Sequence, residues 1–479
     1  MKSCQLHRNF LYHTTTIVFL LFLTIHIVSG AREVLPIKFV HHNNTEMDII
    51  LDTLAAKFPN ITRLYTIGKT YQGKKLRVLE ITEDPGKHIP GKPEFKYIAN
   101  MHGNEVVGRE LLLLLAEHLC EGYGRLPGIT QLMETTRIHL LPSMNPDGWD
   151  AATEGDCTSV VGRFNANGVD LNRNFPDPYD RRLNSLQPET RAIMNWLKSE
   201  PFVLSANLHG GTLVANYPYD NIPSELKRST VRVYYGSPDD DVFVKISKAY
   251  SLAHPTMHKG EPQCPIHKAE RFKDGITNGA AWYPISGGMQ DYNYYFTNCF
   301  AITLELGCCK FPPARYMKDY WFANRGALLN YINMVHTTGI RGFVNDEDGN
   351  PISDVKIIVG DRTKKIKTFK DGDFWRLLTP GKYLVKARKR GYKHSRKIVQ
   401  VYNETSTVIN FTLVAKHKPS KPVELNSIVD KSEKKLSFHV SESQASKLKL
   451  SVNSKGQSTR SRFVTCLLCL VGCFLWPKS

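Results

Sequence analysis

The most constraining stretch of the chain joins a predicted strand to a leucine-rich helix through a short polar turn. Residues 95–99 are predicted as the strand and residues 108–119 as the helix, and the turn between them carries His102, Gly103 and Glu105. Because glycine lets the backbone bend sharply, an imidazole and a carboxylate on this turn are able to bind one metal ion. Zinc in hydrolases usually takes two histidines, one glutamate and a water. The turn therefore predicts a second histidine at another strand end.

His209 is the best candidate for that second ligand. Most of the 17 histidines are expected to be structural or exposed, but His209 follows the apolar residues 202–208 and precedes two glycines. Its placement repeats that of His102, which also follows a strand and precedes a glycine. Strand ends that lie side by side in an α/β sheet bring such ligands together.

The pattern around these two turns predicts an α/β domain with a mixed central sheet flanked by helices. Near-continuous apolar strands that alternate with helices indicate a sheet buried on both faces. The predicted strands are residues 64–67, 75–81, 95–99, 136–142, 202–208 and 299–306, and the predicted helices are residues 48–58, 109–119, 189–199, 242–253 and 320–335.

The composition changes near residue 337, where short alternating strands replace the α/β pattern. Seven strands separated by turn signals such as Asp-Gly and Pro-Gly predict a small all-β sandwich. They are residues 340–344, 355–359, 365–369, 374–378, 381–388, 397–401 and 407–413. We therefore divide the middle of the chain into an α/β domain, residues 31–336, and a sandwich, residues 337–414.

Both ends of the chain suggest the secretory pathway. Residues 1–30 have the basic start, apolar centre and small final residues of a signal peptide. Residues 415–462 are rich in Lys and Ser and predict a flexible stalk. Residues 463–479 are mostly apolar but short for a membrane helix, so we interpret them as a glycolipid-anchor (GPI) signal, with a short membrane span or neither as alternatives.

Cysteines and glycosylation sequons agree with an oxidising, extracellular location. Six cysteines lie between the predicted leader and the predicted tail, and the fifteen possible disulfide pairings stay open. Four Asn-X-Thr sequons predict a glycoprotein. The sequons begin at Asn43, Asn60, Asn403 and Asn410, and the cysteines are Cys120, Cys157, Cys264, Cys299, Cys308 and Cys309.

The net charge of +18 belongs to the C-terminal third of the chain. Residues 31–339 contain 33 basic and 33 acidic side chains, whereas residues 340–414 contain 16 and 8, and residues 415–462 contain 11 and 4. This distribution argues against nucleic acid as a partner. The basic excess is interpreted as a solvated surface and tail, with contact to an anionic membrane or glycan surface as the alternative.

Three further features suit hydrolysis by a metal-activated water. Glu305 lies inside an apolar strand, where a carboxylate must be paired or functional, because burying it alone is costly. A structural ion pair is the alternative for Glu305. Arg163 and the pair Asn172-Arg173 lie in a polar segment that suits recognition of a carboxylate, although they also suit a merely soluble loop.

Six collinear motifs together resemble the zinc metallocarboxypeptidases, and more narrowly their regulatory branch, which includes carboxypeptidases N, E, D and M. The similarity covers roughly residues 34–414, and residues 340–413 resemble the transthyretin-like domain of that branch. The motifs are His102-Gly-Asn-Glu105, Asn145-Pro-Asp-Gly148, Gly162-Arg163, Asp170-Leu-Asn172-Arg173-Asn-Phe175, His209-Gly-Gly211 and Thr303-Leu-Glu305-Leu-Gly307.

The resemblance implies a role for each residue of the constellation. One zinc ion per catalytic domain would be bound by His102, Glu105 and His209. Glu305 would act as the general base, and Arg163 would stabilise the oxyanion of the scissile bond.

Substrate recognition is also implied by the resemblance. Asn172 and Arg173 would bind the free C-terminal carboxylate of a peptide, and Tyr283 would close over it. In this branch an acidic residue eleven positions after the second zinc histidine favours Lys or Arg as the last substrate residue, and Asp220 occupies that position, with Gln290 as its expected hydrogen-bond partner.

These features predict a monomeric extracellular zinc exopeptidase, tethered to the membrane or secreted, that removes C-terminal Arg or Lys from peptides and proteins. The alternative is a catalytically weak or inactive peptide-binding or adhesion module of the same fold, because the branch includes members that lack active-site residues. The presence of the ligands, the base and both arginines favours the enzyme.

Overall fold

The computed structural model describes residues 35–180, 185–226 and 232–416, which belong to one compact unit. The predicted signal peptide, stalk and anchor signal lie outside these ranges, apart from the first two residues of the stalk. No helix within the described ranges is both long and apolar enough to span a membrane.

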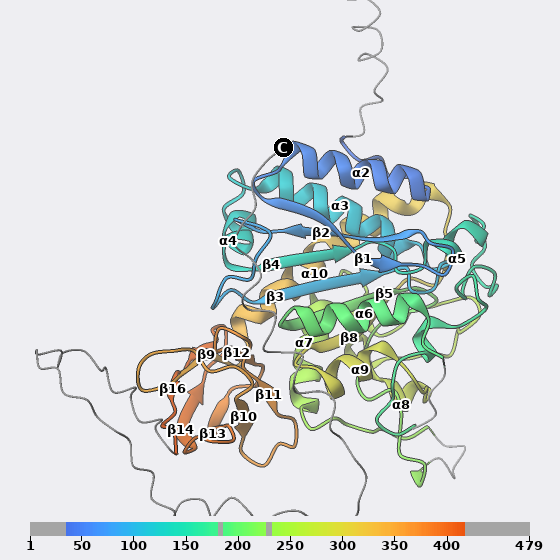
Figure 1. Cartoon of the computed structure of the whole chain (residues 1–479). Coiled ribbons are helices and arrows are strands. Elements are labelled where there is room, and N and C mark those ends of the chain that lie inside the picture. Colours follow the sequence, from blue (N-terminus) through green and yellow to red (C-terminus); the bar gives the residue numbers. More distant parts are fainter. Residues whose placement is uncertain (1–34, 181–184, 227–231, 417–479) are drawn as a thin grey trace, which may run out of the picture. The chain divides into compact units, whose positions relative to one another are not determined.

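An eight-stranded mixed sheet forms the centre of the larger part, in the order β1-β2-β4-β3-β5-β8-β6-β7 (Figure 1). Four neighbours at its centre, β4, β3, β5 and β8, run parallel, while β1, β2 and β6 pair antiparallel to their inner neighbours. The strands are β1 (Thr62–Lys69), β2 (Lys75–Ile81), β3 (Glu94–Ala99), β4 (Arg137–Leu141), β5 (Phe202–His209), β6 (Leu213–Tyr217), β7 (Ile276–Asn278) and β8 (Phe300–Leu306).

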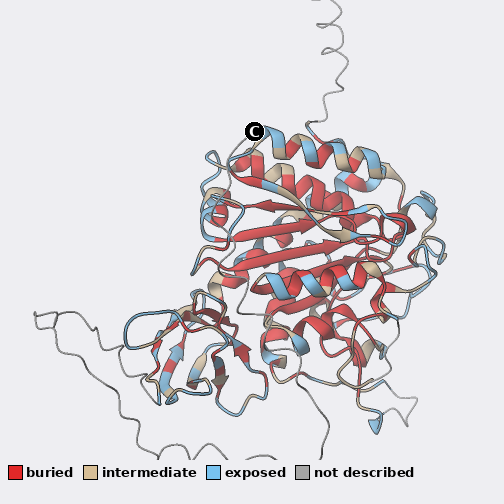
Figure 2. Cartoon of the chain, viewed as in Figure 1, coloured by how far each residue is buried: buried red, intermediate tan, exposed pale blue. Residues whose placement is uncertain are grey.

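Helices cover both faces of this sheet, so its central strands are buried throughout (Figure 2). Successive residues Tyr97 and Ile98 of β3 enter two different apolar clusters, one on each face. One cluster includes residues of α2 (Asn44–Lys57), α3 (Val107–Gly122), α7 (Asp240–Ala253) and α10 (Met317–Thr337), and the other includes residues of α6 (Pro188–Ser199) and α9 (Met289–Phe296). This two-sided burial explains why the strands have no polar alternation.

Every strand and helix predicted for this part is present, with ends that differ by a few residues, and the predicted fold class is confirmed. The prediction omitted two helices of eight or nine residues and two strands of the central sheet. In α9, buried polar residues such as Gln290 and Asn293 hide the amphipathic pattern. The omitted elements are α4 (Pro127–Thr135), α9, β6 and β7. The shorter helical segments that were also not predicted are α5 (Pro146–Ala151), η1 (Leu171–Arg173), η3 (Met257–Lys259), η4 (Lys273–Gly275), α8 (Gly279–Trp282) and η5 (Ala314–Tyr316).

The rest of the described chain is a β-sandwich of two four-stranded layers with its own apolar cluster between them. One sheet has the order β11-β10-β13-β14, and the other is β12-β9-β15, with β16 also paired to β9. The strands are β9 (Ile340–Asn345), β10 (Lys356–Val359), β11 (Ile366–Lys367), β12 (Asp373–Arg376), β13 (Gly381–Arg388), β14 (Ser395–Val401), β15 (Thr407–Val408) and β16 (Phe411–Thr412).

The prediction of a single strand at residues 407–413 is wrong, because this segment forms two short strands, β15 and β16. Both β15 and β16 pair parallel with β9 in the same register, and the ladder is interrupted between them. At the interruption the side-chain oxygen of Asn410 accepts the hydrogen bond of the Phe343 backbone N–H at 2.9 Å. The Asn410 side chain thus takes the place of a backbone carbonyl as the acceptor for Phe343.

Two disulfides, Cys157–Cys309 and Cys264–Cys308, settle the pairing that the sequence left open. Cys308 and Cys309 lie two and three residues after the end of β8, so both bridges attach distant loops to the end of that strand. Cys120 and Cys299 are buried and unpaired within the described part of the chain.

A buried ion cluster joins the two parts of the described chain. Asp239, just before α7, accepts hydrogen bonds from Arg362 at 2.8 Å and Arg376 at 2.6 Å, both from the sandwich. Its second oxygen accepts from the Tyr294 hydroxyl at 2.8 Å. Asp239 and Arg376 have no exposed surface, so each charge depends on the other for compensation.

We expect Asp239→Ala to lower the free energy of unfolding by about 3–5 kcal/mol, because it leaves the buried Arg376 guanidinium without its counter-charge. Asp241→Ala is the matched control, since Asp241 also pairs with Arg362 but is 43% exposed, and it should cost about 1 kcal/mol or less. Urea unfolding of both variants measures the difference. Equal losses would contradict the importance of the buried cluster.

Candidate metal centre

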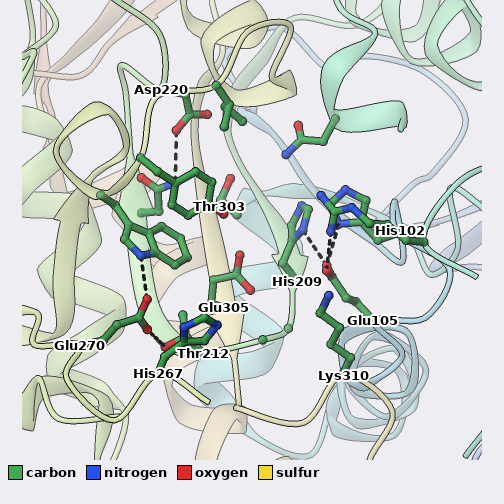
Figure 3. A pocket seen from close by; sticks show the side chains of 18 of the residues that line it. His102, Glu105, His209, Thr212, Asp220, His267, Glu270, Thr303, Glu305 and Lys310 are labelled. Atoms are coloured by element: carbon green, nitrogen blue, oxygen red, sulfur yellow. Dashed lines mark hydrogen bonds and ion pairs between the residues drawn. The ribbon is translucent and has the colours of Figure 1, made fainter. Parts of the chain in front are cut away.

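Three potential metal ligands meet at the carboxyl ends of neighbouring parallel strands. His102 and Glu105 lie on the turn after β3, and His209 is the last residue of β5. Glu105 Oε2 lies 2.9 Å from His102 Nδ1 and 2.8 Å from His209 Nδ1 (Figure 3). The three side chains are buried, and their ligand atoms lie within 4.8 Å of one another. The structure thus brings together the three residues that the sequence suggested.

Gly103 and Asn100 give the turn that carries His102 and Glu105 its shape. A Cβ on Gly103 would lie 2.2 Å from the backbone of Gly148, so no larger residue fits there. Asn100 has a positive φ of 56°, and its side-chain amide donates to the carbonyls of His102, Gly103 and Glu105. Asn100 was not among the predicted site residues, although an asparagine directly after a strand is a turn signal.

The donor set fits zinc. Burial opposes the ionisation of Glu105, but the charges and hydrogen bonds of His102 and His209 outweigh it, so the pKa of Glu105 lies well below its ordinary value. An ionised carboxylate between two imidazoles is the two-His, one-Glu set found in zinc hydrolases such as thermolysin and carboxypeptidase A. These residues are therefore the ones that would hold the metal.

Glu305 lies on the neighbouring strand β8, directly opposite His209 in the strand register. It is 8% exposed, and its Oε2 atom has no hydrogen-bond partner among the described residues. Burial, reinforced by the nearby charge of Glu105, raises the pKa of Glu305 to about 7. A buried carboxyl group of this kind is suited to accept and release a proton near neutral pH.

Arg163 approaches the same centre from a loop and is held by Asp170. The Nε and Nη2 atoms of Arg163 lie 3.0 and 2.9 Å from Asp170 Oδ2, while its Nη1 lies 3.3 Å from Glu105 Oε1. Asp170 also lies 3.1 Å from His102 Nε2. Asp170 therefore orients both a ligand and the arginine; its position in the Asp-Leu-Asn-Arg motif was the signal that could have identified it.

Asn172 and Arg173 lie in the short helical turn η1, beside the same cavity. The Asn172 side-chain oxygen accepts from the backbone N–H of Met289 at 2.9 Å, and Arg173 Nη1 donates to the Asn172 carbonyl at 2.9 Å. Tyr283, which follows α8, is 42% exposed, and its ring lies 4.5 Å from that of Trp282. An exposed tyrosine at the cavity wall has room to move.

Asp220 is buried in the wall of the same cavity. Its Oδ1 atom accepts hydrogen bonds from Gln290 Nε2 at 2.6 Å and Asn216 Nδ2 at 3.2 Å. The Thr303 hydroxyl donates to Gln290 at 2.9 Å, so Gln290 is itself oriented. Burial raises the pKa of Asp220 to about 7, and Figure 3 places Asp220 on the far side of the cavity from His102.

One cavity of about 330 Å³ thus collects nearly all of the predicted site. Gln290 is the exception, because it contacts Asp220 from behind instead of lining the cavity. Lys310 and Glu270 also line the cavity but were not predicted as site residues. Glu270 accepts hydrogen bonds from Trp282 Nε1 at 3.0 Å and from Thr212 Oγ1 at 2.9 Å. Lys310, Glu270 and Thr212 come from loops without a recognisable motif, and Trp282 is the last residue of α8. The predicted residues that line this cavity are His102, Glu105, Arg163, Asn172, Arg173, His209, Asp220, Tyr283 and Glu305.

Two family models match the chain. Residues 47–327 match the zinc carboxypeptidase model, and residues 339–414 match the carboxypeptidase regulatory-like domain. The two matches cover the mixed-sheet part and the sandwich, respectively.

Three relatives illustrate the similarity. Carboxypeptidase D of Homo sapiens is 50% identical over 387 residues, which is 81% of this chain but 28% of that protein. The carboxypeptidase N catalytic chain of Rattus norvegicus is 44% identical over 418 residues, covering 82% of this chain and 90% of the relative. Carboxypeptidase M of Mus musculus is 46% identical over 365 residues, covering 75% of this chain and 80% of the relative.

The chain spans little more than a quarter of the carboxypeptidase D relatives that it matches. The order of parts predicted from the sequence, with one catalytic unit, a sandwich, a stalk and an apolar tail, most resembles carboxypeptidase M, with a single-unit relative of carboxypeptidase D as the alternative. Both proteins are among these relatives.

Proposed function

Because the chain belongs to the zinc carboxypeptidase family, we propose that it is an extracellular zinc exopeptidase that removes C-terminal Arg or Lys from peptides and proteins. One observation carries the choice of substrate. The buried carboxylate of Asp220 lies in the same cavity as the three metal ligands and Glu305, so a basic side chain bound there would place the last peptide bond near the metal.

Zinc bound by His102, Glu105 and His209, one ion per catalytic domain, would polarise both a water molecule and the scissile carbonyl. Glu305 would accept the proton of that water and later deliver it to the leaving amine. Its unpaired buried oxygen and raised pKa support this role. Arg163, held in place by Asp170, would stabilise the negative charge that develops on the carbonyl oxygen.

Recognition of the free chain end would come from Asn172 and Arg173. A guanidinium and an amide present donors that match a carboxylate. Requiring a terminal carboxylate is what makes the reaction exopeptidic. Tyr283 would close over the bound residue, which its exposure at the cavity wall permits.

Selection of a basic last residue would come from Asp220. A buried carboxylate pairs favourably with a guanidinium or ammonium group and leaves an uncompensated polar site when the substrate is apolar. Gln290 and Asn216 hold the Asp220 side chain in a fixed orientation, so recognition requires little reorganisation.

A catalytically weak or inactive peptide-binding module of the same fold is the second candidate. The ligands, the base and the two arginines lie around one cavity, which supports the enzyme over this alternative.

We place the protein in the secretory pathway and at the cell surface. The proposed order is a signal peptide (1–30), catalytic domain (31–336), transthyretin-like sandwich (337–414), basic stalk (415–462) and anchor signal (463–479), with a GPI-anchored protein favoured over a secreted one. Sequon residues Asn43, Asn60, Asn403 and Asn410 are exposed, which suits a glycoprotein. We propose a monomer that does not bind nucleic acid.

Glu305→Gln should retain about one zinc per chain but lose about 10²- to 10⁴-fold in kcat, because the amide cannot accept the water proton. Elemental analysis and hydrolysis of a peptide ending in Arg measure the two effects. His209→Ala is the companion variant and should lose zinc as well as activity. A largely active Glu305→Gln variant would contradict the role of Glu305 as the base.

Asp220→Asn should lower kcat/KM for peptides that end in Arg or Lys by about 100-fold, since a substrate charge would then be buried without its partner. Asparagine keeps the size of the side chain, so a matched peptide ending in Phe should change only a few-fold. Equal losses on both peptides would refute the assignment of Asp220 as the specificity residue.

Preference for a basic end should rise with pH. Because burial raises the pKa of Asp220 to about 7, its carboxyl group is mostly neutral below that pH and ionised above it. The ratio of kcat/KM for the Arg-ended peptide to that for the Phe-ended peptide should therefore increase between about pH 5.5 and 8. Taking the ratio cancels the titration of groups that serve both substrates, and Asp220→Asn should give a flat profile.

A further inference from the structure

The outer face of the sheet β11-β10-β13-β14 in the sandwich carries a charge pattern that the proposed catalysis does not use. Alternate residues of these strands, such as Ile357 and Val385, point inward and are buried in the sandwich core. The intervening residues point outward, and the cartoon coloured by exposure shows pale blue and tan segments on these strands (Figure 2).

Like charges lie directly opposite one another on this outer face. Lys356 of β10 pairs with Lys367 of β11 on one side and with Arg388 of β13 on the other. One step along, Lys386 of β13 pairs with Arg396 of β14. Directly opposed like charges destabilise a sheet, so this arrangement has a cost for folding that a bound anion would remove.

Acidic residues do little to compensate this charge. The face borders a cavity of about 1030 Å³ in which Asp354, 3.3 Å from Lys367, is the only acidic lining residue among those the structure describes. Loop residues add further positive charge to the same cavity. The basic residues that line it are Lys356, Lys365, Lys367, Lys386, Arg388, Lys389, Arg390 and Lys416, with His394 beside them.

We propose that this cavity is a binding site for a linear sulfated polysaccharide, which would hold the enzyme within a polyanionic matrix. Ammonium and guanidinium groups on adjacent strands, about 5 Å apart, match the closely spaced sulfates of such a chain. The ligand neutralises the like charges that oppose one another across the sheet, and binding of this kind weakens steeply with salt.

The shape of the site favours a polymer over a membrane surface. The basic side chains line a cavity, which a single polysaccharide chain can enter but a flat bilayer touches only at the rim. The exposed apolar pair Leu384 and Ile398 on the same face, which would suit a bilayer, does not line that cavity.

Retention of the full-length protein on immobilised heparin, with elution by NaCl, tests the site. The triple variant Lys356→Gln/Lys386→Gln/Arg388→Gln removes three charges from the face. The control Lys38→Gln/Lys259→Gln/Lys318→Gln removes three from exposed positions outside the sandwich, none of which lines that cavity. We expect the first variant to lose at least about tenfold in heparin affinity at physiological salt, and the control to stay within about twofold.

Thermal unfolding of each variant separates binding from folding. Because the face variant relieves repulsion, its melting temperature should equal or exceed that of the unmodified chain, and Lys386→Gln alone serves if the triple variant does not fold. Equal affinity losses in both triple variants would show that only the total charge matters and overturn the proposal. Binding to vesicles that contain phosphatidylserine, without retention on heparin, would overturn it in favour of a membrane surface.

Discussion

The parallel pairing of β3, β5 and β8 is the constraint on which the site depends. Parallel neighbours end at the same edge of a sheet, so residues that follow them in sequence meet in space although the chain between them is long. His102, His209 and Glu305 come from these three strands, and their side chains gather around one cavity. Both disulfides attach loops just beyond the end of β8, which stiffens the edge where these residues meet.

Three buried carboxyl groups in this cavity have different pKa values because their neighbours differ. Glu105 is surrounded by two imidazoles, and its pKa falls well below the ordinary value. Glu305 and Asp220 are buried with weaker positive partners, and the pKa of each rises to about 7. Neighbouring carboxyl groups with separated pKa values are a common basis for dividing roles in an active site, here between the proposed ligand, base and specificity residue.

Charge is also divided between the two parts of the described chain. The mixed-sheet part is close to neutral, and the chemistry proposed for it depends on a few buried groups instead of a general field. The sandwich carries the basic excess on one outer sheet face, while Arg362, in the loop between β10 and β11, and Arg376, in β12 of the other sheet, bind Asp239. The proposed polyanion site and the proposed catalytic site therefore act through separate surfaces of one chain.

Local patterns in the sequence determined the fold class, most elements and the candidate ligands, because burial periodicity and glycine turns are short-range signals. His102, Glu105 and His209 were recognisable for that reason. Tertiary structure alone decided which cysteines pair, that Asn410 interrupts a strand, and that Asp170 orients Arg163. The disulfide pairing and the Asn410 contact depend on segments far apart in the chain, and the Arg163–Asp170 contact depends on how one loop folds. None of these contacts produces a periodic pattern in the sequence.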